Sequence, residues 1–275
     1  MNLWNQFARA GSDQTATNAT ATRTDMLKII LCALGLLAAS AAAFAADESE
    51  KNVRDAMHSL LPMTKIDQIA KSELPGFHEV IVSGQVVYVS DDGKYLLQGS
   101  LYNVPQKKDL TAQRVARMRA QALSGLPDSK KMIFAPENPK HYVTVFTDVD
   151  CPFCRQFHKQ ITEYNKQGIS VKYVLYPLDI HPGADKKAAA VWCADDRNAA
   201  YTAAMNGKDP GVKGTCSNPV AETKALGVAL GINATPTILA DDGSSIDSTT
   251  AMSPVALAAA LDKKAAAKAK PVASR

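Results

Sequence analysis

The stretch HYVTVFTDVDCPFC, residues 141–154, decides the fold of this chain. Its first half is rich in β-branched and aromatic residues and predicts a strand over residues 141–147. A Cys-Pro-Phe-Cys motif follows, then a helix-like segment over residues 155–167 and a second run of β-formers over residues 169–176. The order strand, Cys-x-x-Cys, helix, strand predicts a βαβ unit.

The two cysteines of the motif are the candidate reactive groups. Cys151 is expected at the amino end of the helix, where the helix dipole and free backbone N–H groups favour the thiolate, so we predict that it is the nucleophile. Cys154 lies one turn deeper, and we expect it to stay protonated until it resolves a mixed disulfide. Asp148 and Asp150 would oppose the thiolate if their side chains faced Cys151, because nearby negative charge raises the pKa of a thiol.

Two other interpretations of the motif are weaker. Cys151, Cys154 and His158 share a helix face, and Cys-x-x-Cys recurs in zinc sites. A structural zinc usually takes its second ligand pair at similarly tight spacing, whereas Cys193 and Cys216 lie far apart without a neighbouring His. We therefore predict no metal and interpret His158 as an exposed helix residue. An inert Cys151–Cys154 disulfide is the other alternative, but such a bridge is seldom needed for stability at the start of a helix.

The sequence after the motif predicts helices and one more strand. Residues 182–231 are rich in alanine and helical in character, interrupted by a loop over residues 206–218. A strand opened by proline is expected over residues 235–240, followed by a turn at residues 241–243. A closing helix over residues 253–264 has Ser253 as its N-cap. We expect Trp192 to pack in the core.

The sequence before the motif predicts a small α+β module. A helix is expected over residues 47–62, strands over residues 79–83 and 85–90, and a turn at residues 91–93 that leads into a third strand. About 60 residues are marginal for an independent core, so we expect the module to pair with a second copy in a homodimer. The polar segment from Gln106 to Ser124 predicts a solvated connecting helix, and the irregular passage after it predicts a domain boundary.

The first 46 residues are typical of an export leader. The segment from Met26 to Ala46 has a lysine, an apolar stretch and the small residues of a cleavage site, so we predict a signal peptide cut after Ala45 or Ala46. A membrane anchor is the alternative, because its run of uncharged residues almost reaches the length that spans a bilayer. Residues 1–25 lack apolar periodicity, and we hypothesise that Met26 is the true start. Four cysteines would remain in a compartment where thiols oxidise.

The composition excludes several classes of protein. The chain has 275 residues, with 31 Lys plus Arg against 27 Asp plus Glu, and 46% of its residues are hydrophobic. This balance does not fit a disordered chain. A net charge of +4 without a basic cluster does not indicate nucleic-acid binding. Five cysteines are too few for a disulfide-stapled miniprotein.

Three motifs together resemble one known family. They are VYVSDDGKYLLQG at residues 87–99, VFTD at residues 145–148 before Cys-Pro-Phe-Cys, and GINATP at residues 231–236. With them the chain from Asp47 onward resembles the periplasmic disulfide isomerases of the DsbC/DsbG family. The resemblance implies an α+β fold in the following order: a removed leader (1–46), a small cystatin-like N-terminal dimerisation domain (47–105), a linker helix (106–126), a thioredoxin-like α/β domain with a helical insertion (127–264), and a flexible tail (265–275).

The resemblance also implies roles for four residues outside the motif. Pro236 matches the cis-proline of the family, which would leave the backbone of Thr235 free to pair with an extended substrate strand. Cys193 and Cys216 match the second, non-catalytic disulfide of the DsbC branch. Closing a loop of this size stabilises a protein by about 3 kcal/mol in the chain-entropy model. The Pro-Phe dipeptide between the active cysteines departs from both branches, and the second cysteine pair favours the DsbC branch.

The function implied is that of a periplasmic protein disulfide isomerase without a bound cofactor. It would reshuffle incorrect disulfides of exported proteins as a V-shaped homodimer with a shared, largely uncharged cleft, and a membrane reductase of the DsbD type would supply its electrons. One alternative is a DsbG-like reductase of single oxidised cysteines. A second alternative is a periplasmic chaperone in which the redox pair is secondary.

Overall fold

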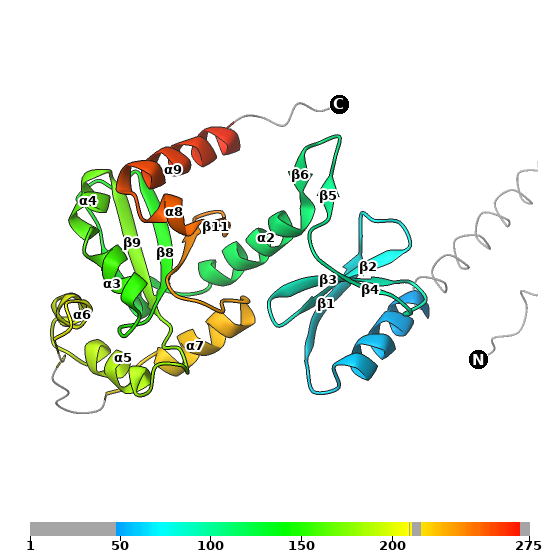
Figure 1. Ribbon diagram of the computed structural model, residues 1–275, viewed down its shortest axis with the longest axis horizontal. Coiled ribbons are helices and arrows are strands. Elements are labelled where there is room, and N and C mark those ends of the chain that lie inside the picture. The colour runs from blue at the N-terminus through cyan, green and yellow to red at the C-terminus, as the bar shows by residue number, and fades with distance from the viewer. Residues whose placement is uncertain (1–47, 209, 211–215, 270–275) are drawn as a thin grey trace, which may run out of the picture. The chain divides into compact units, whose positions relative to one another are not determined.

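The computed structural model describes residues 48–208, 210 and 216–269 (Figure 1). The predicted leader, its cleavage after Ala45 or Ala46 and the start at Met26 lie outside the described residues, as does the end of the predicted tail. Within the described part of the chain, no helix has the length and apolar character needed to cross a membrane.

An antiparallel sheet follows the first described helix, residues 48–60. Its strands have the order β1-β2-β3-β4, with bounds β1 Ile66–Lys71, β2 Phe77–Val82, β3 Gln85–Ser90 and β4 Leu96–Gln98. Ser83 and Gly84 both have positive φ, as a two-residue turn between twisted strands requires. Val53 and Met57 of the helix pack against valines of β2 and β3. The predicted α+β module is therefore present, with β1 as a strand that the sequence did not indicate.

The connecting helix starts later than predicted. A short hairpin of β5 (Tyr102–Asn103) and β6 (Lys108–Asp109) precedes α2 (Leu110–Ser124). Asp109 sets the start of the helix, because its carboxylate accepts a hydrogen bond from the Ala112 N–H at 2.8 Å. No residue of α2 is fully buried, which agrees with the polar sequence of a connecting helix.

The motif region is built on a five-stranded sheet with the order β11-β10-β8-β9-β7. Strands β8 (His141–Thr147) and β9 (Ile169–Leu175) pair in parallel, which confirms the predicted βαβ unit. The other pairs are antiparallel, with bounds β7 Met132–Phe134, β10 Thr237–Ala240 and β11 Ser245–Ile246. Because β8 is central, the loop that follows it emerges from the best-supported part of the sheet.

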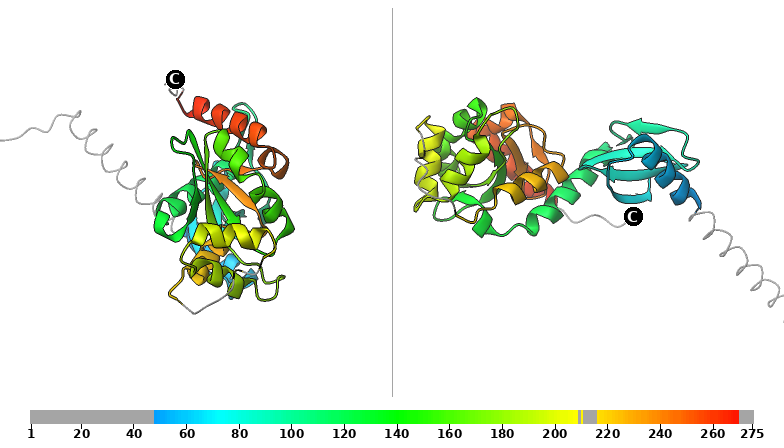
Figure 2. Two further views of the ribbon diagram at one scale, coloured as in Figure 1. Left: turned by 90° about the vertical axis from the view of Figure 1, so that its left-hand side faces the viewer. Right: turned by 90° about the horizontal axis from the view of Figure 1, so that it is seen from below.

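Helices cover both faces of this sheet (Figures 1 and 2). On one face, α3 (Pro152–His158), α4 (Ile161–Lys166) and α9 (Pro254–Ala269) pack over β8 and β9, together with α5 (Ala184–Trp192) and α6 (Arg197–Met205). On the other face lie the end of α2 and α7 (Val220–Ala229). Two short helical turns complete the described elements, Asp128–Lys130 and α8 (Ser248–Ala251).

Two helices differ from the prediction. The single helix expected over residues 155–167 is divided into α3 and α4, with a break at Lys159 and Gln160. The closing helix continues past its predicted end to Ala269, since the alanine and lysine residues of the expected tail favour helix. α3 starts at Pro152, directly after Cys151, which the sequence placed at the amino end of the helix.

Gly227 lets α7 pack closely against Tyr176, the residue that follows β9. A Cβ atom on Gly227 would lie 2.4 Å from the ring of Tyr176, so the aromatic ring occupies the place of a side chain. The Tyr176 hydroxyl donates a hydrogen bond to the Ile232 carbonyl at 2.6 Å. This contact fixes the segment that leads into the loop containing Pro236.

Candidate active site

The two cysteines of the motif lie at the start of α3. Cys151 is the N-cap of the helix and Pro152 is its first residue. Proline suits this position because it has no N–H group to satisfy and its φ is already helical. The backbone N–H groups of Phe153 and Cys154 are thereby free to face the sulfur of Cys151. The local sequence thus builds a set of hydrogen-bond donors around one sulfur atom.

A loop distant in the sequence completes the site. The Thr235–Pro236 peptide bond is cis, and the Cys151 thiol donates a hydrogen bond to the Thr235 carbonyl at 3.1 Å. The Thr235 hydroxyl is also buried and forms no hydrogen bond in the described structure. The fold therefore brings Cys151, Thr235 and Pro236 together, as the resemblance implied, although the Thr235 carbonyl is occupied by the thiol.

The pKa values of the two thiols are shifted in opposite directions. The Cys154 thiol, the Thr235 side chain and the backbone N–H groups of α3 stabilise the thiolate and lower the pKa of Cys151 to about 5, although burial opposes the shift. Burial raises the pKa of Cys154, and its hydrogen bond to Cys151 raises it further. At neutral pH the arrangement holds one thiolate and one thiol, so one sulfur can attack while the other keeps its proton.

Neither sulfur is widely open to solvent. Cys151 is 4% exposed and Cys154 is 1% exposed, and both are free thiols. The Thr235 carbonyl, next to the cis-proline, lies 3.1 Å from the Cys151 sulfur and contributes to its burial. Phe153, between the two cysteines, is 63% exposed.

The two aspartates before Cys151 are both held by donors. Asp148 is buried, and its carboxylate accepts hydrogen bonds from the Leu178 N–H at 2.7 Å, the Asp150 N–H at 2.8 Å and His181 Nδ1 at 2.8 Å. Asp150 forms ion pairs with Arg155 at 3.2 Å and Lys187 at 2.8 Å. Each negative charge next to the reactive sulfur is therefore compensated.

Sequence reasoning did not find these partners. His181 and Lys187 lie 33 and 37 positions from the aspartates they contact. Arg155 is four residues after Cys151 on the same helix, and this spacing is the one local signal that could have indicated a role near the sulfur.

The prediction that His158 is exposed is wrong. His158 is 3% exposed, and its ring nitrogens lie 3.0 Å from the Tyr173 hydroxyl and 3.0 Å from the Thr202 hydroxyl. The side of α3 that carries His158 faces β9 and α6, and this covering could not be read from the helix alone. Burial lowers the pKa of His158 to about 4. The described residues contain no group of three metal-ligating side chains.

The second cysteine pair lies apart from the motif. Cys193, at the end of α5, forms a disulfide with Cys216, with a Cα–Cα distance of 5.7 Å. Trp192 is buried in the core, as expected, and the Arg197 guanidinium lies 4.1 Å from the centre of its ring. Cys216 is exposed. This pair joins the end of α5 to the segment before α7, with α6 between the two cysteines.

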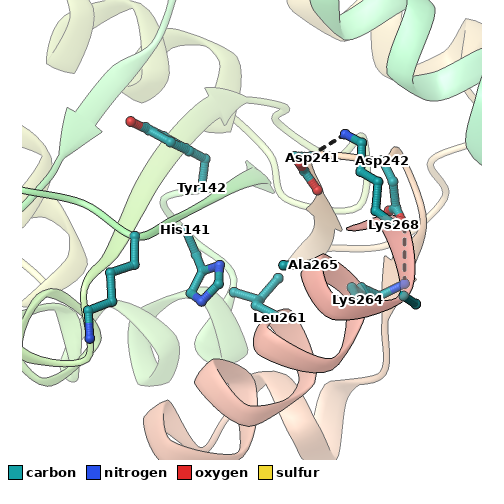
Figure 3. A pocket seen from close by; sticks show the side chains of 10 residues that line it. His141, Tyr142, Asp241, Asp242, Leu261, Lys264, Ala265 and Lys268 are labelled. Carbon is teal, nitrogen blue, oxygen red and sulfur yellow. Dashed lines mark hydrogen bonds and ion pairs between the residues drawn. The ribbon is translucent and has the colours of Figure 1, made fainter. Parts of the chain in front are cut away.

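A hollow of about 700 Å³ lies elsewhere in the fold (Figure 3). His141 and Tyr142 line it at the beginning of β8, whereas the Cys151 site follows the end of that strand. Its carboxylates are paired with lysines of α9, Asp242 with Lys264 and Asp241 with Lys268. None of the predicted site residues lines this hollow.

Two family models match the chain. The disulfide bond isomerase protein N-terminal domain matches residues 42–112, and a thioredoxin-like domain matches residues 129–265. The first match covers the four-stranded module and the second covers the five-stranded sheet with both cysteine pairs.

Curated relatives match over most of the chain. The thiol:disulfide interchange protein DsbC of Dickeya dadantii is 34% identical over 217 residues, 78% of this chain and 87% of that protein. The DsbC protein of Escherichia coli K12 is 32% identical over 65% of this chain and 75% of its own length. Among solved structures, a disulfide interchange protein from Neisseria gonorrhoeae is 37% identical over 41% of this chain and 81% of its own, with a TM-score of 0.38.

Proposed function

The chain belongs to the DsbC family of thiol:disulfide interchange proteins, and from this premise we propose that it reshuffles incorrect disulfides of exported proteins with Cys151 as the nucleophile. The observation that carries the proposal is the difference between the two thiols of the motif. Cys151 has a pKa of about 5, and burial raises the pKa of its neighbour Cys154.

The first step is attack on the substrate. The Cys151 thiolate attacks one sulfur of an incorrect disulfide, a mixed disulfide forms, and the substrate S–S bond breaks. The second substrate sulfur leaves as a thiolate and takes a proton from water. Loss of the Cys151 proton also removes the donor from the Thr235 carbonyl, so the carbonyl becomes available to an extended segment of the substrate.

Two exits follow from the mixed disulfide. In isomerisation, another substrate thiolate attacks the substrate sulfur of the mixed disulfide, the correct pair forms, and the Cys151 thiolate is released without net electron transfer. In reduction, Cys154 loses its proton and attacks the Cys151 sulfur, and the substrate leaves with two thiols. That exit oxidises the Cys151–Cys154 pair, so an external dithiol reductant, of the membrane DsbD type, must return two electrons.

The four-stranded module supports a homodimer. In the described residues β4 pairs only with β3, so its outer edge is free, and Leu96 and Leu97 are 38% and 47% exposed. An apolar edge strand of this kind is a template for pairing with another chain. We therefore assign the edge of β4 to contact with a second copy. Sedimentation of Leu97→Lys should show a monomer, whereas Tyr142→Lys, at a residue 46% exposed on β8, should remain dimeric.

Export to the periplasm fits the chemistry. The Cys193–Cys216 disulfide persists in an oxidising compartment, and the reactive pair requires substrates that contain disulfides. Fractionation of cells that express the full chain, with mass analysis of the mature N-terminus, tests the compartment and the cleavage after Ala45 or Ala46. Retention of the protein in the cytoplasm would contradict this part of the proposal.

Refolding of a scrambled multi-disulfide protein tests the central claim. The reduced wild-type protein should restore activity to the scrambled substrate, and Cys151→Ala should abolish this effect. Suppression of aggregation of a cysteine-free client separates the chaperone alternative, because it should survive in Cys151→Ala. Unchanged refolding by Cys151→Ala would exclude the isomerase. Reduction of a single oxidised cysteine without any refolding activity would instead favour the DsbG-like alternative.

A further inference from the structure

A cluster of three charged side chains lies at Asp150, the residue that precedes Cys151 in the chain. Both carboxylate oxygens of Asp150 contact Lys187 Nζ, at 2.8 and 2.9 Å. Arg155 contacts the same carboxylate at 3.2 Å. We propose that Arg155 and Lys187 are positioning residues that neutralise Asp150 and so keep its charge from opposing the thiolate of Cys151. The inference deepens the proposed function, because it assigns the electrostatic support of the same nucleophile.

Arg155 acts on the turn as well as on the charge. Its Nε donates a hydrogen bond to the Val149 carbonyl at 3.0 Å, while its terminal nitrogen contacts Asp150. Because Arg155 belongs to α3, it ties the turn before the helix to the helix itself. Lys187 comes from α5, and Asp150 is its only contact among the side-chain interactions of the described structure. The two cations therefore differ: one also shapes the backbone, and the other contributes charge.

The cluster is partly shielded from water. The side chain of Asp150 is 19% exposed, that of Arg155 is 35% exposed and that of Lys187 is 50% exposed. A half-buried carboxylate is screened less than a surface one, so an unpaired Asp150 would act on a neighbouring thiolate more strongly than a solvated group. With both cations in place the cluster carries a net positive charge, which favours the thiolate.

The other charges around Cys151 are accounted for. Asp148, on the same turn, is held by His181 and by backbone N–H groups. Lys208 lines the hollow that also contains Arg155 and Lys187, and it adds positive charge to that side. The loop of Thr235 and Pro236 carries no ionisable side chain. Asp150 is thus the negative group whose compensation depends on side chains alone.

Titration of Cys151 tests the role of the two cations. The rate at which iodoacetamide alkylates the reduced protein is measured against pH, and the modified peptide is identified by mass. Lys187→Ala should raise the midpoint by about 0.5 pH unit, the effect of one partly screened charge near the sulfur. Arg155→Ala should raise it by at least as much, but it also removes the contact to Val149, so Lys187→Ala carries the test.

A second substitution separates charge from structure. Asp150→Asn removes the negative charge, so Asp150→Asn/Lys187→Ala should return the midpoint to that of the wild type. A double variant that keeps the raised midpoint would show that Lys187 acts through structure and would overturn the inference. An unchanged midpoint in Lys187→Ala would overturn it as well. Lys166→Ala, which breaks the exposed pair with Glu163 on α4, is the matched control and should leave the midpoint unchanged.

The same titration distinguishes this inference from the proposed function. If wild-type Cys151 titrates near pH 5 and refolds scrambled substrates while Lys187→Ala behaves identically, only the role of the cations fails. If wild-type Cys151 titrates like an ordinary thiol, near pH 8.5, the proposed nucleophile itself fails. Circular dichroism of every variant verifies that the fold is kept.

Discussion

The two cysteine pairs of this protein differ in almost every physical respect. Cys151 and Cys154 are three residues apart at the start of a helix, are free thiols and are buried. Cys193 and Cys216 are 23 residues apart, form a disulfide and join the end of α5 to an exposed position before α7. The pair assigned to chemistry is thus the less exposed one. Hydrogen-bond donors around the sulfur, rather than contact with solvent, set its reactivity.

Removal of the disulfide should have the largest effect. Cys193→Ser/Cys216→Ser should lower the free energy of unfolding by about 3 kcal/mol, because the unfolded chain regains the freedom of the closed loop. Urea denaturation measures this change. Alkylation of Cys151 in the folded variant should keep its wild-type rate and midpoint. A large loss of Cys151 reactivity would show that the two pairs are coupled and would break the comparison.

Graded reduction of the oxidised protein should separate the pairs. At pH 7 the low pKa of Cys151 favours its reduced form by about 100-fold over a thiol of ordinary pKa, so the Cys151–Cys154 disulfide should open first. Cys193–Cys216 has no comparable stabilised thiolate. Mass-spectrometric mapping after treatment with increasing glutathione measures the order. Opening of Cys193–Cys216 first would reverse the roles of the two pairs.

Acid should destabilise the fold through protonation of His158, which lies in α3. The pKa of His158 is about 4 in the folded protein and about 6.5 in the unfolded chain, so the unfolded state takes up its proton first as the pH falls. The contribution of His158 is fully present above pH 6.5 and decreases toward pH 4, with a loss of roughly 2 kcal/mol at pH 5. His158→Gln should remove this part of the pH dependence of urea unfolding. The same slope in wild type and His158→Gln would contradict the assignment.

The acidity of Cys151 gives the smallest expected effect. Its pKa of about 5 predicts an alkylation rate that is constant at neutral pH and falls about tenfold per unit below pH 5, because the thiolate is the reacting form. In the unfolded chain in urea, the midpoint should move to that of an ordinary thiol. A folded midpoint that equals the unfolded one would remove the difference between the pairs on which the proposed function depends.

Local patterns predicted the parts of the fold that local physics determines. The β-formers of β8, the proline at the start of α3 and the serine before α9 each act through neighbouring residues, and all three elements begin where the sequence placed them. Strands β1 and β7 were missed because they are short or carry polar residues, and pairing with longer neighbours stabilises them. The break between α3 and α4 has no signal that propensity alone would show.

The candidate site, like the fold, has features that the local sequence predicts and features that it does not predict. The helix start and the two thiols of unequal depth could be predicted from spacing. Lys187, which contacts Asp150, and His181, which contacts Asp148, come from segments far along the chain, so only the tertiary fold reveals them. The prediction that His158 is exposed failed for the same reason, since its partners Tyr173 and Thr202 lie on other elements.

Because Gly227 has no side chain, the packing of α7 is coupled to the active site through Tyr176. A methyl group there would displace the Tyr176 ring, whose hydroxyl holds the Ile232 carbonyl four residues before Pro236. An alanine that improves helix propensity by about 1 kcal/mol would therefore shift the loop that covers the reactive sulfur. A substitution chosen only to stabilise α7 would therefore disturb the active site, although Gly227 contacts neither cysteine.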